Sequence, residues 1–98
     1  MAGMATMSDT EVKDALADLP GWELSGGEIV KEYKFADFAA AMAFVNQVAE
    51  AAEAANHHPD IDIRWNKVRL ALSTHSEGGL TQNDFALAAQ IESLAGTR

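Results

Sequence analysis

The three histidines of this sequence lie where side chains can carry out proton chemistry. His57 and His58 are adjacent, at the point where a long apolar segment meets Pro59, and His75 follows a strand-like run. Imidazole has an unperturbed pKa close to neutrality, so it donates or accepts a proton at little cost. Rigid elements often hold functional groups at their ends. The positions are compatible with acid–base catalysis, but histidines are more often surface or satisfied core residues, and an adjacent pair at a helix C-terminus is also typical of a simple polar helix end.

Metal binding is the second chemistry that three histidines allow, with Glu53 or Asp84 as a fourth ligand. Neighbouring residues on a helix point about 100° apart, so His57 and His58 do not converge easily on one ion. The recurring zinc pattern places two histidines four residues apart on a helix, and the sequence lacks it. We therefore expect no metal site.

Three residues near the histidines have both a functional and a structural interpretation. Glu53 precedes His57 by four residues, so it either orients that histidine on a shared helix face or is a solvated acid. Asp84 either supports a histidine or caps a helix. Trp22, beside a Pro-Gly turn, either walls a cleft or belongs to the core. The pattern alone favours the structural role for all three.

Helical spacing predicts three helices that would position these residues. Ser8 and Glu11 have the form of a capping box, and the helix after them would end at Pro20-Gly21. Residues 37–55 form the longest helical segment, and Thr81 with Asp84 would cap the last helix. The apolar residues expected on the buried sides are Val12, Leu16 and Leu19 of the first helix, Phe38, Met42, Val45, Ala49 and Ala52 of the second, and Leu87, Ala88, Ile91, Leu94 and Ala95 of the third.

Alternating or turn-bounded segments predict four strands between the helices. Residues 22–25 and 28–35 flank Gly26-Gly27, and residues 61–65 and 68–73 flank Asn66-Lys67, so each pair reads as a hairpin. The order is helix, two strands, helix, two strands, helix. We therefore expect an α+β fold in which an antiparallel four-stranded sheet carries three helices on one face.

The bulk composition limits the class of protein. A chain of 98 residues is one domain in size, so we expect a flexible leader at 1–7 and a single domain at 8–98. The net charge of -8 disfavours direct nucleic-acid binding. The absence of cysteine excludes disulfides and thiolate chemistry. The leader lacks a signal-peptide pattern and no apolar run would span a bilayer, so we expect a cytoplasmic protein without membrane contact.

A set of short motifs resembles the signature of the pterin-4a-carbinolamine dehydratase family. The similarity covers the chain from about Leu19 to Leu94 and departs from the usual pattern at Asp60-Ile61 and Asn83. His-His-Pro alone is weak, but its combination with the later motifs in this order and spacing is specific. The matching segments are Gly21-Trp22, 35–38, 53–59 with His57-His58-Pro59, 65–68, Leu72-Ser73-Thr74-His75, 79–81 and Asp84.

The resemblance implies the removal of water from a 4a-hydroxylated pterin without a metal or organic cofactor. It also implies the same α+β fold, and association as a homodimer or homotetramer. By resemblance, His57, His58 and His75 line the pterin site, and we expect His58 and His75 to be the proton-transfer pair. The remaining residues that the resemblance implies at the site are Pro59, Ser73 and Thr74 against the pterin ring, Trp22 as a wall, and Glu53 and Asp84 in support of the histidines.

Two rival classes of protein remain compatible with the sequence. One is a non-catalytic module that binds a pterin or assembles another protein on the same fold. The other is a metal-dependent hydrolase or oxygenase, which would require stoichiometric zinc or iron.

Overall fold

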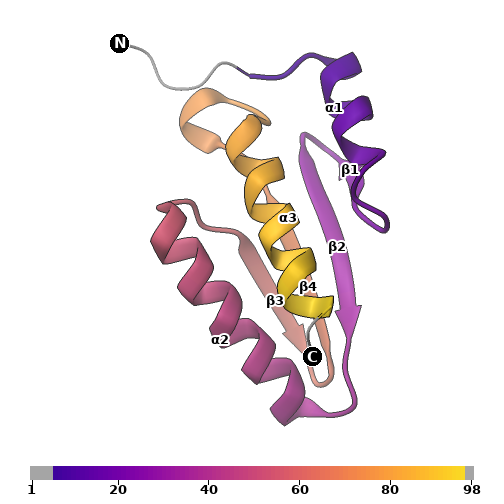
Figure 1. Ribbon diagram of the computed structural model, residues 1–98, viewed down its shortest axis with the longest axis vertical. Coiled ribbons are helices and arrows are strands. Elements are labelled where there is room, and N and C mark those ends of the chain that lie inside the picture. The colour runs from indigo at the N-terminus through magenta and orange to yellow at the C-terminus, as the bar shows by residue number, and fades with distance from the viewer. Residues whose placement is uncertain (1–5, 97–98) are drawn as a thin grey trace.

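The computed structural model describes residues 6–96, which form three α-helices and one antiparallel four-stranded sheet. The helices are α1 (Asp9–Leu16), α2 (Phe38–Ala55) and α3 (Gln82–Gly96). The strands are β1 (Glu23–Ser25), β2 (Glu28–Lys34), β3 (Asp60–Arg64) and β4 (Lys67–Leu72), in the spatial order β1-β2-β4-β3. A short 3-10 helix, η1 (His75–Glu77), follows β4. The predicted α+β fold and its element order are confirmed (Figure 1).

The structure confirms the predicted start of the first helix and the first hairpin turn, but not the predicted end of that helix. Ser8 and Glu11 form the predicted capping box at the start of α1. Gly26 and Gly27 both have positive φ, as a tight hairpin between β1 and β2 requires. The first helix ends at Leu16, short of Pro20-Gly21, and Leu19 still reaches the core from the turn that follows. Of the predicted leader, Met7 donates its N–H to the carbonyl of Leu80, and residues 1–5 lie outside the described part of the chain.

The core lies between one face of the sheet and helices α2 and α3, which Figure 1 shows side by side over the strands. Phe44 of α2 is fully buried, with its ring centroid 5.0 Å from that of Tyr33 and 4.9 Å from that of Phe35. Val12 of α1 joins the same core cluster. The predicted buried side of α3 is confirmed at Leu87, Ala88 and Ile91.

The predicted buried stripe of α2 is only partly right: Ala52 is buried and Val45 packs against the core, but the centre of the buried face lies elsewhere. The helix buries Ala41, Phe44, Val48 and Ala52, whereas Phe38 is 50% exposed and Ala49 is exposed. The two lines of residues lie about 100° apart, one position along the helix. Because α2 is apolar on most of its surface, both lines satisfy the helical spacing, and only the packing of α3 decides between them.

The turn between β3 and β4 lies one residue earlier than predicted. Trp65 and Asn66 form it, and Trp65 has a φ of 54° and is 67% exposed, so it does not continue the half-buried face of β3. Asn66 fixes the turn, because its amide donates to the carbonyl of Phe35 and its own carbonyl accepts from the Phe35 N–H. This contact joins the hairpin to the segment that leads into α2.

Candidate functional site

A Schellman motif ends α2 and directs the two adjacent histidines away from the helix. Asn56 has a φ of 50°, its N–H bonds to the carbonyl of Glu53, and the N–H of His57 bonds to the carbonyl of Ala52. The chain then passes through His58 and Pro59 into β3. Since the helix stops at this left-handed residue, His57 does not lie on the helix face of Glu53.

His57 is held by a buried carboxylate. Its Nε2 lies 2.6 Å from Oδ1 of Asp84, and the side chains are 11% and 0% exposed. The other oxygen of Asp84, Oδ2, accepts hydrogen bonds from the Thr74 hydroxyl at 2.8 Å and from the Thr81 N–H at 2.9 Å. An ionised carboxylate only accepts, so Nε2 of His57 carries a proton and Nδ1 is the nitrogen left to exchange one.

Asp84 therefore fills both of the roles that the sequence left open. As the third residue of α3 it accepts from the N–H of Thr81, which precedes the helix, while the Thr81 hydroxyl accepts from the Asn83 N–H. This arrangement caps the helix. The same carboxylate orients an imidazole, as the carboxylates of catalytic triads do.

His58 pairs with Glu53 on the surface. Its Nε2 lies 2.6 Å from Oε2 of Glu53, and the side chains are 57% and 78% exposed. The sequence spacing suggested Glu53 as a partner of His57, and this pairing is wrong because Asn56 breaks the helix between them. An exposed pair of this kind adds little stability, so its main effect is on the position of the His58 ring.

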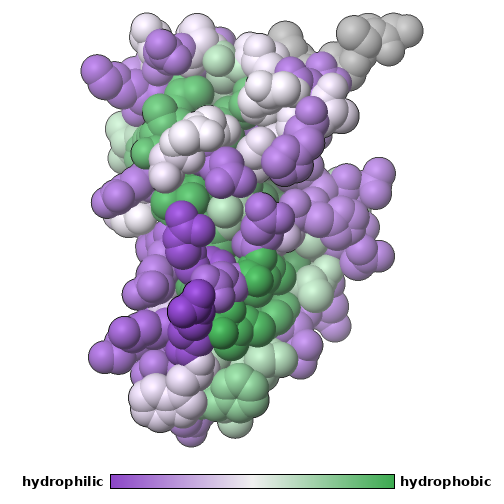
Figure 2. Space-filling model, turned by 180° about the vertical axis from the view of Figure 1, so that it is seen from behind, coloured by the Kyte–Doolittle hydropathy of each residue, from purple (hydrophilic) through white to green (hydrophobic). Residues whose placement is uncertain are grey.

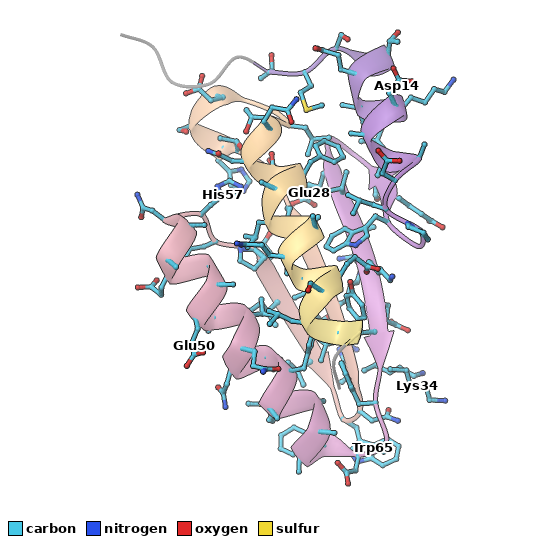
Figure 3. The ribbon with its side chains drawn as sticks, in the orientation of Figure 1. Asp14, Glu28, Lys34, Glu50, His57 and Trp65 are labelled. Atoms are coloured by element: carbon cyan, nitrogen blue, oxygen red, sulfur yellow. The ribbon has the colours of Figure 1, made fainter. Side chains whose placement is uncertain are left out.

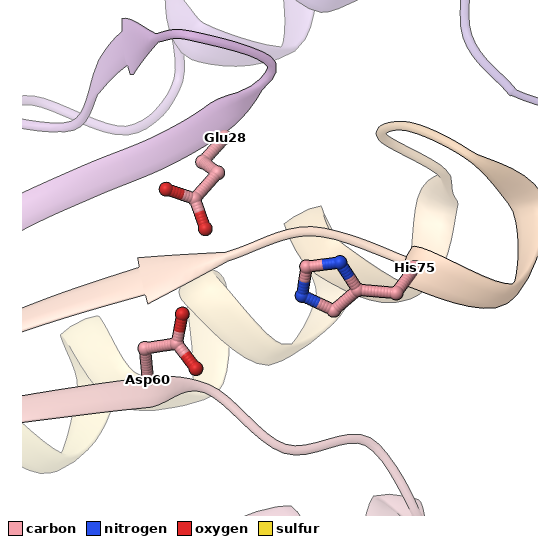
Figure 4. A group of neighbouring side chains, drawn as sticks. All are labelled: Glu28, Asp60 and His75. Carbon is pink, nitrogen blue, oxygen red and sulfur yellow. The ribbon is translucent and has the colours of Figure 1, made fainter.

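His75 faces a third set of carboxylates. It begins η1, after two residues that follow β4, and its ring lies with the carboxylates of Glu28 from β2 and Asp60 from β3 in one group (Figure 4). One ligand atom from each of the three residues lies within 4.8 Å of the others. Glu28 was not among the site residues predicted from the sequence. Its place beside His75 depends on the strand order, which no local motif encodes.

The contacts bring all three histidines to one end of the sheet. Thr74, which precedes His75, bonds to the same Asp84 carboxylate that holds His57. Asp60, two residues after His58, belongs to the group around His75. Each histidine nevertheless contacts different carboxylates, so the three rings of the described chain lie in separate polar groups.

The other predicted site residues occupy different surroundings. Thr74 is buried beneath His75, while Ser73 and Pro59 are half-buried at the ends of β4 and β3. Trp22 is only 4% exposed, and its indole N–H donates to Oε1 of Glu92 at 3.2 Å. Its ring packs edge-on against Tyr33, with centroids 6.5 Å apart.

Glu92 joins Trp22 to a compact polar group between β2 and α3. Its Oε1 also accepts from Nζ of Lys31 at 2.6 Å and from the Tyr33 hydroxyl. Burial alone would raise the pKa of Glu92, but the hydrogen bonds from Lys31 and Tyr33 outweigh it and hold the pKa below its usual value. Burial, together with the Glu92 carboxylate, raises the pKa of the Tyr33 hydroxyl. Lys31 of β2 thus neutralises the carboxylate of Glu92, which α3 places against the core face of the sheet.

The site is open rather than enclosed. No pocket is formed by residues 6–96 of the single chain, and His58 and His75 are exposed. Figure 3 shows His57 between the end of α2 and the start of α3. No helix in the described part of the chain is long and apolar enough to cross a membrane. The fold and site thus define a small α+β domain with three histidines at one sheet end, each set against acidic groups.

Comparison with known proteins assigns this domain to a family. The family model described as pterin 4 alpha carbinolamine dehydratase matches residues 5–94. A protein of Acidobacterium capsulatum, provisionally named pterin-4-alpha-carbinolamine dehydratase, is 58% identical over 91 residues, which cover 93% of this chain and 99% of that protein. A protein of Chloroflexus aurantiacus with the same provisional name is 56% identical and covers 95% of this chain and 100% of its own.

Two solved structures share the fold. The crystal structure of a transcriptional coactivator/pterin dehydratase from Brucella melitensis is 36% identical, with a TM-score of 0.89 over 93% of this chain and 99% of that chain. A pterin dehydratase-like protein described as a RuBisCO assembly factor in the alpha-carboxysome is 25% identical, with a TM-score of 0.63 over 76% of this chain and 87% of that chain. The chain belongs to the pterin-4-alpha-carbinolamine dehydratase family, a family of hydro-lyases.

Proposed function

We propose that this chain catalyses the dehydration of 4a-hydroxytetrahydropterin to quinonoid dihydropterin and water, in the recycling of a pterin cofactor in the cytoplasm. The observation that carries the proposal is the gathering of three histidines at one end of the sheet in a chain that belongs to this family. Each histidine has at least one carboxylate close to its ring, and imidazole is the side chain best suited to donate and accept protons near neutral pH. The site therefore suits a reaction that needs both a proton donor and a proton acceptor near neutral pH.

The reaction requires two proton transfers. An acid protonates the hydroxyl on C4a, which leaves as water, and a base removes the proton of the adjacent ring nitrogen as a C=N bond forms. We assign these transfers to His58 and His75, whose exposed rings are open to a substrate. His57 would lie at the same site with a fixed tautomer, because Asp84 holds its Nε2–H. No metal or organic cofactor takes part in this scheme.

The remaining residues of the proposed site would bind or position. Pro59, Ser73 and Thr74 would contact the pterin ring largely through backbone groups, while Glu53 and Asp84 would position His58 and His57. Trp22 would act as a wall. Because only 4% of Trp22 is exposed, this role would involve little of its surface.

Stopped-flow absorbance of 4a-hydroxytetrahydropterin decay tests the proposal directly. The protein should accelerate the decay, and His58→Ala and His75→Ala should each lose most of that acceleration, since general acid–base catalysis contributes roughly 10²–10⁴-fold. Glu50→Gln, on the exposed face of α2, is the matched control and should react like the unmodified chain. Full activity in both histidine variants would refute the assignment of the proton-transfer pair.

A second candidate function is the assembly of another protein without catalysis. It is favoured by the likeness to the pterin dehydratase-like protein that is described as a RuBisCO assembly factor. The same stopped-flow measurement separates the two functions. Decay at the uncatalysed rate, in a folded protein with all three histidines intact, would favour the assembly module over the dehydratase.

We further propose that the chain forms a homodimer or homotetramer. Four large apolar side chains of the described residues are exposed, namely Leu24, Phe38, Ile61 and Trp65. Figure 2 shows apolar areas among the hydrophilic residues on the side opposite to the view of Figure 1. Light scattering after gel filtration should give a multiple of the 10.5 kDa chain mass, and Phe38→Ser with Trp65→Ser should reduce it. A monomer at all concentrations would exclude this association.

A further inference from the structure

We propose that Glu28, Asp60 and His75 bind one divalent ion of the Zn²⁺ class on the uncovered face of the sheet, and that the bound ion withdraws His75 from proton transfer. The inhibitory half of this proposal rests on the dehydratase function proposed above. The binding half stands on the geometry of three side chains from three separate elements (Figure 4).

The three side chains need only small movements to coordinate an ion. Their ligand atoms already lie within 4.8 Å of one another. Zinc bonds to nitrogen and carboxylate oxygen at about 2.0–2.2 Å, so ligand atoms in a tetrahedral site lie about 3.4 Å apart. Asp60 and His75 are exposed and Glu28 is half-buried, so rotation of these side chains can close the difference. Figure 4 shows the two carboxylates on either side of β4, with the imidazole beside them.

The backbone beneath these side chains is firmly paired. Asp60 lies opposite Ala71 of the central strand β4, and Val30, two residues after Glu28, lies opposite the same alanine. The segment around His75 is closed by hydrogen bonds from the Thr74 N–H to the Gly79 carbonyl and from the Gly78 N–H to the His75 carbonyl. Ligands on such a frame lose little freedom when an ion binds.

The charge pattern of this face favours a cation at this end. The register places Arg69 between Glu32 and Asp62, and it places Lys67 between Lys34 and Arg64. The basic residues of the outer face therefore lie toward the β3–β4 hairpin. At the other end, neither Glu28 nor Asp60 has an ion-pair partner among the described lysines and arginines. A divalent cation would relieve the repulsion between these two carboxylates.

The donor set selects the class of ion. One imidazole nitrogen with carboxylate oxygens suits borderline ions such as Zn²⁺ and Co²⁺, whereas Mg²⁺ prefers oxygen ligands and retains its waters. Imidazole coordinates through a lone pair, so a histidine that binds an ion cannot also hold a proton on that nitrogen. Occupation of the site should therefore inhibit dehydration without displacing His57 or His58, which contact other carboxylates.

Isothermal titration of the full chain with Zn²⁺, and separately with Mg²⁺, tests the binding. We expect one Zn²⁺ per chain, much weaker Mg²⁺ binding, and a loss of about tenfold or more in Zn²⁺ affinity in Glu28→Gln and in Asp60→Asn, since even indirect partners of metal ligands contribute 10–100-fold. Glu32→Gln is the matched control, because this glutamate lies on the outer face of β2 opposite Arg69. The visible spectrum of bound Co²⁺ should change in Glu28→Gln and not in Glu32→Gln.

The outcomes separate the site from the proposed function. Equal Zn²⁺ affinity in the unmodified chain and in Glu28→Gln, or equal affinity for Zn²⁺ and Mg²⁺, would overturn the metal site. Relative to its own rate in metal-free buffer, Glu28→Gln should be inhibited by Zn²⁺ much less than the unmodified chain. Binding that depends on Glu28 in a chain without dehydratase activity would support the site and refute the function. Activity that saturating Zn²⁺ leaves unchanged would overturn the inhibitory half.

Discussion

Replacement of Asp84 by asparagine exchanges one oxygen of a buried carboxylate for an amide NH₂ group. The Thr81 N–H is an obligatory donor to Oδ2, and the Thr74 hydroxyl donates to the same atom. The amide oxygen must therefore take the place of Oδ2, and the amide nitrogen must take the place of Oδ1, which faces Nε2 of His57. An amide nitrogen cannot accept a hydrogen bond, so Nε2 has to become the acceptor. We predict that Asp84→Asn moves the proton of His57 from Nε2 to Nδ1.

The contacts set the expected loss of stability. In Asp84→Asn, two hydrogen bonds to a charged acceptor become bonds to a neutral one, which costs about 1 kcal/mol each and about 2 kcal/mol in total. For a domain of this size, that loss lowers Tm by roughly 8–16 °C. Asp84→Ala instead leaves the donors of Thr74, Thr81 and His57 without their acceptor. Each buried unsatisfied group costs about 1–3 kcal/mol, so we expect a loss of about 4 kcal/mol or more.

Two measurements check this prediction. Thermal unfolding should rank the unmodified chain above Asp84→Asn and Asp84→Asn well above Asp84→Ala. Long-range ¹⁵N–¹H correlation spectra, which distinguish the two tautomers of a neutral imidazole, should show the Nε2–H tautomer of His57 in the unmodified chain and the Nδ1–H tautomer in Asp84→Asn. An Nε2–H tautomer that persists in Asp84→Asn, or equal instability of the two variants, would refute the argument.

The buried contacts allow three more predictions. Because folding lowers the pKa of Glu92, this carboxylate contributes its full stabilisation above the usual value of 4.5, and the contribution is lost as the pH falls through the lowered pKa. Glu92→Gln should therefore flatten the acid dependence of the free energy of unfolding measured in urea. An unchanged dependence on pH would contradict this. Tyr33 is the single tyrosine and its pKa is raised, so tyrosinate absorbance should appear only with alkaline unfolding, rather than near the usual value of 10.0. Phe44→Ala should lower the free energy of unfolding by about 3–5 kcal/mol in denaturant unfolding of the diluted chain. Phe38→Ala should lower it by less than about 1 kcal/mol. Equal losses would contradict the assigned buried stripe.

The sequence was sufficient for features that depend on local chemistry. Three such features are the capping box at Ser8, the Gly26-Gly27 hairpin and the end of α2 at Asn56. Each depends on backbone angles or hydrogen bonds between residues close together in the sequence. The α+β element order followed because the hydrophobic period changes cleanly between helical and strand segments. The ends of these elements also placed the histidines correctly, since His57 and His58 follow α2 and His75 follows β4.

The sequence did not determine which residues of different helices and strands pack against each other. The apolar surface of α2 offers two helical stripes, and the packing of α3 selects the one with Phe44. Glu28 lies near His75 only because β4 inserts between β2 and β3. Lys31 interrupts an otherwise apolar face of β2, and it becomes understandable only with Glu92, 61 residues later in the chain. Such choices depend on contacts between distant residues, which local spacing does not determine.

The surroundings of the three histidines differ in a way that bears on their roles. His57 is almost fully buried and fixed by Asp84, whose other oxygen is tied to two more donors, so its proton on Nε2 is held by a rigid network. His58 contacts an exposed Glu53, and His75 faces two carboxylates without their own cationic partners among the described residues. A ring that must gain and lose a proton needs surroundings that tolerate both states. The exposed pair meets that condition, because solvent reaches both rings and adjusts to the change in charge. The network around Asp84 is instead satisfied only when Nε2 of His57 donates. This difference is the physical reason to assign proton transfer to His58 and His75 and orientation of the site to His57.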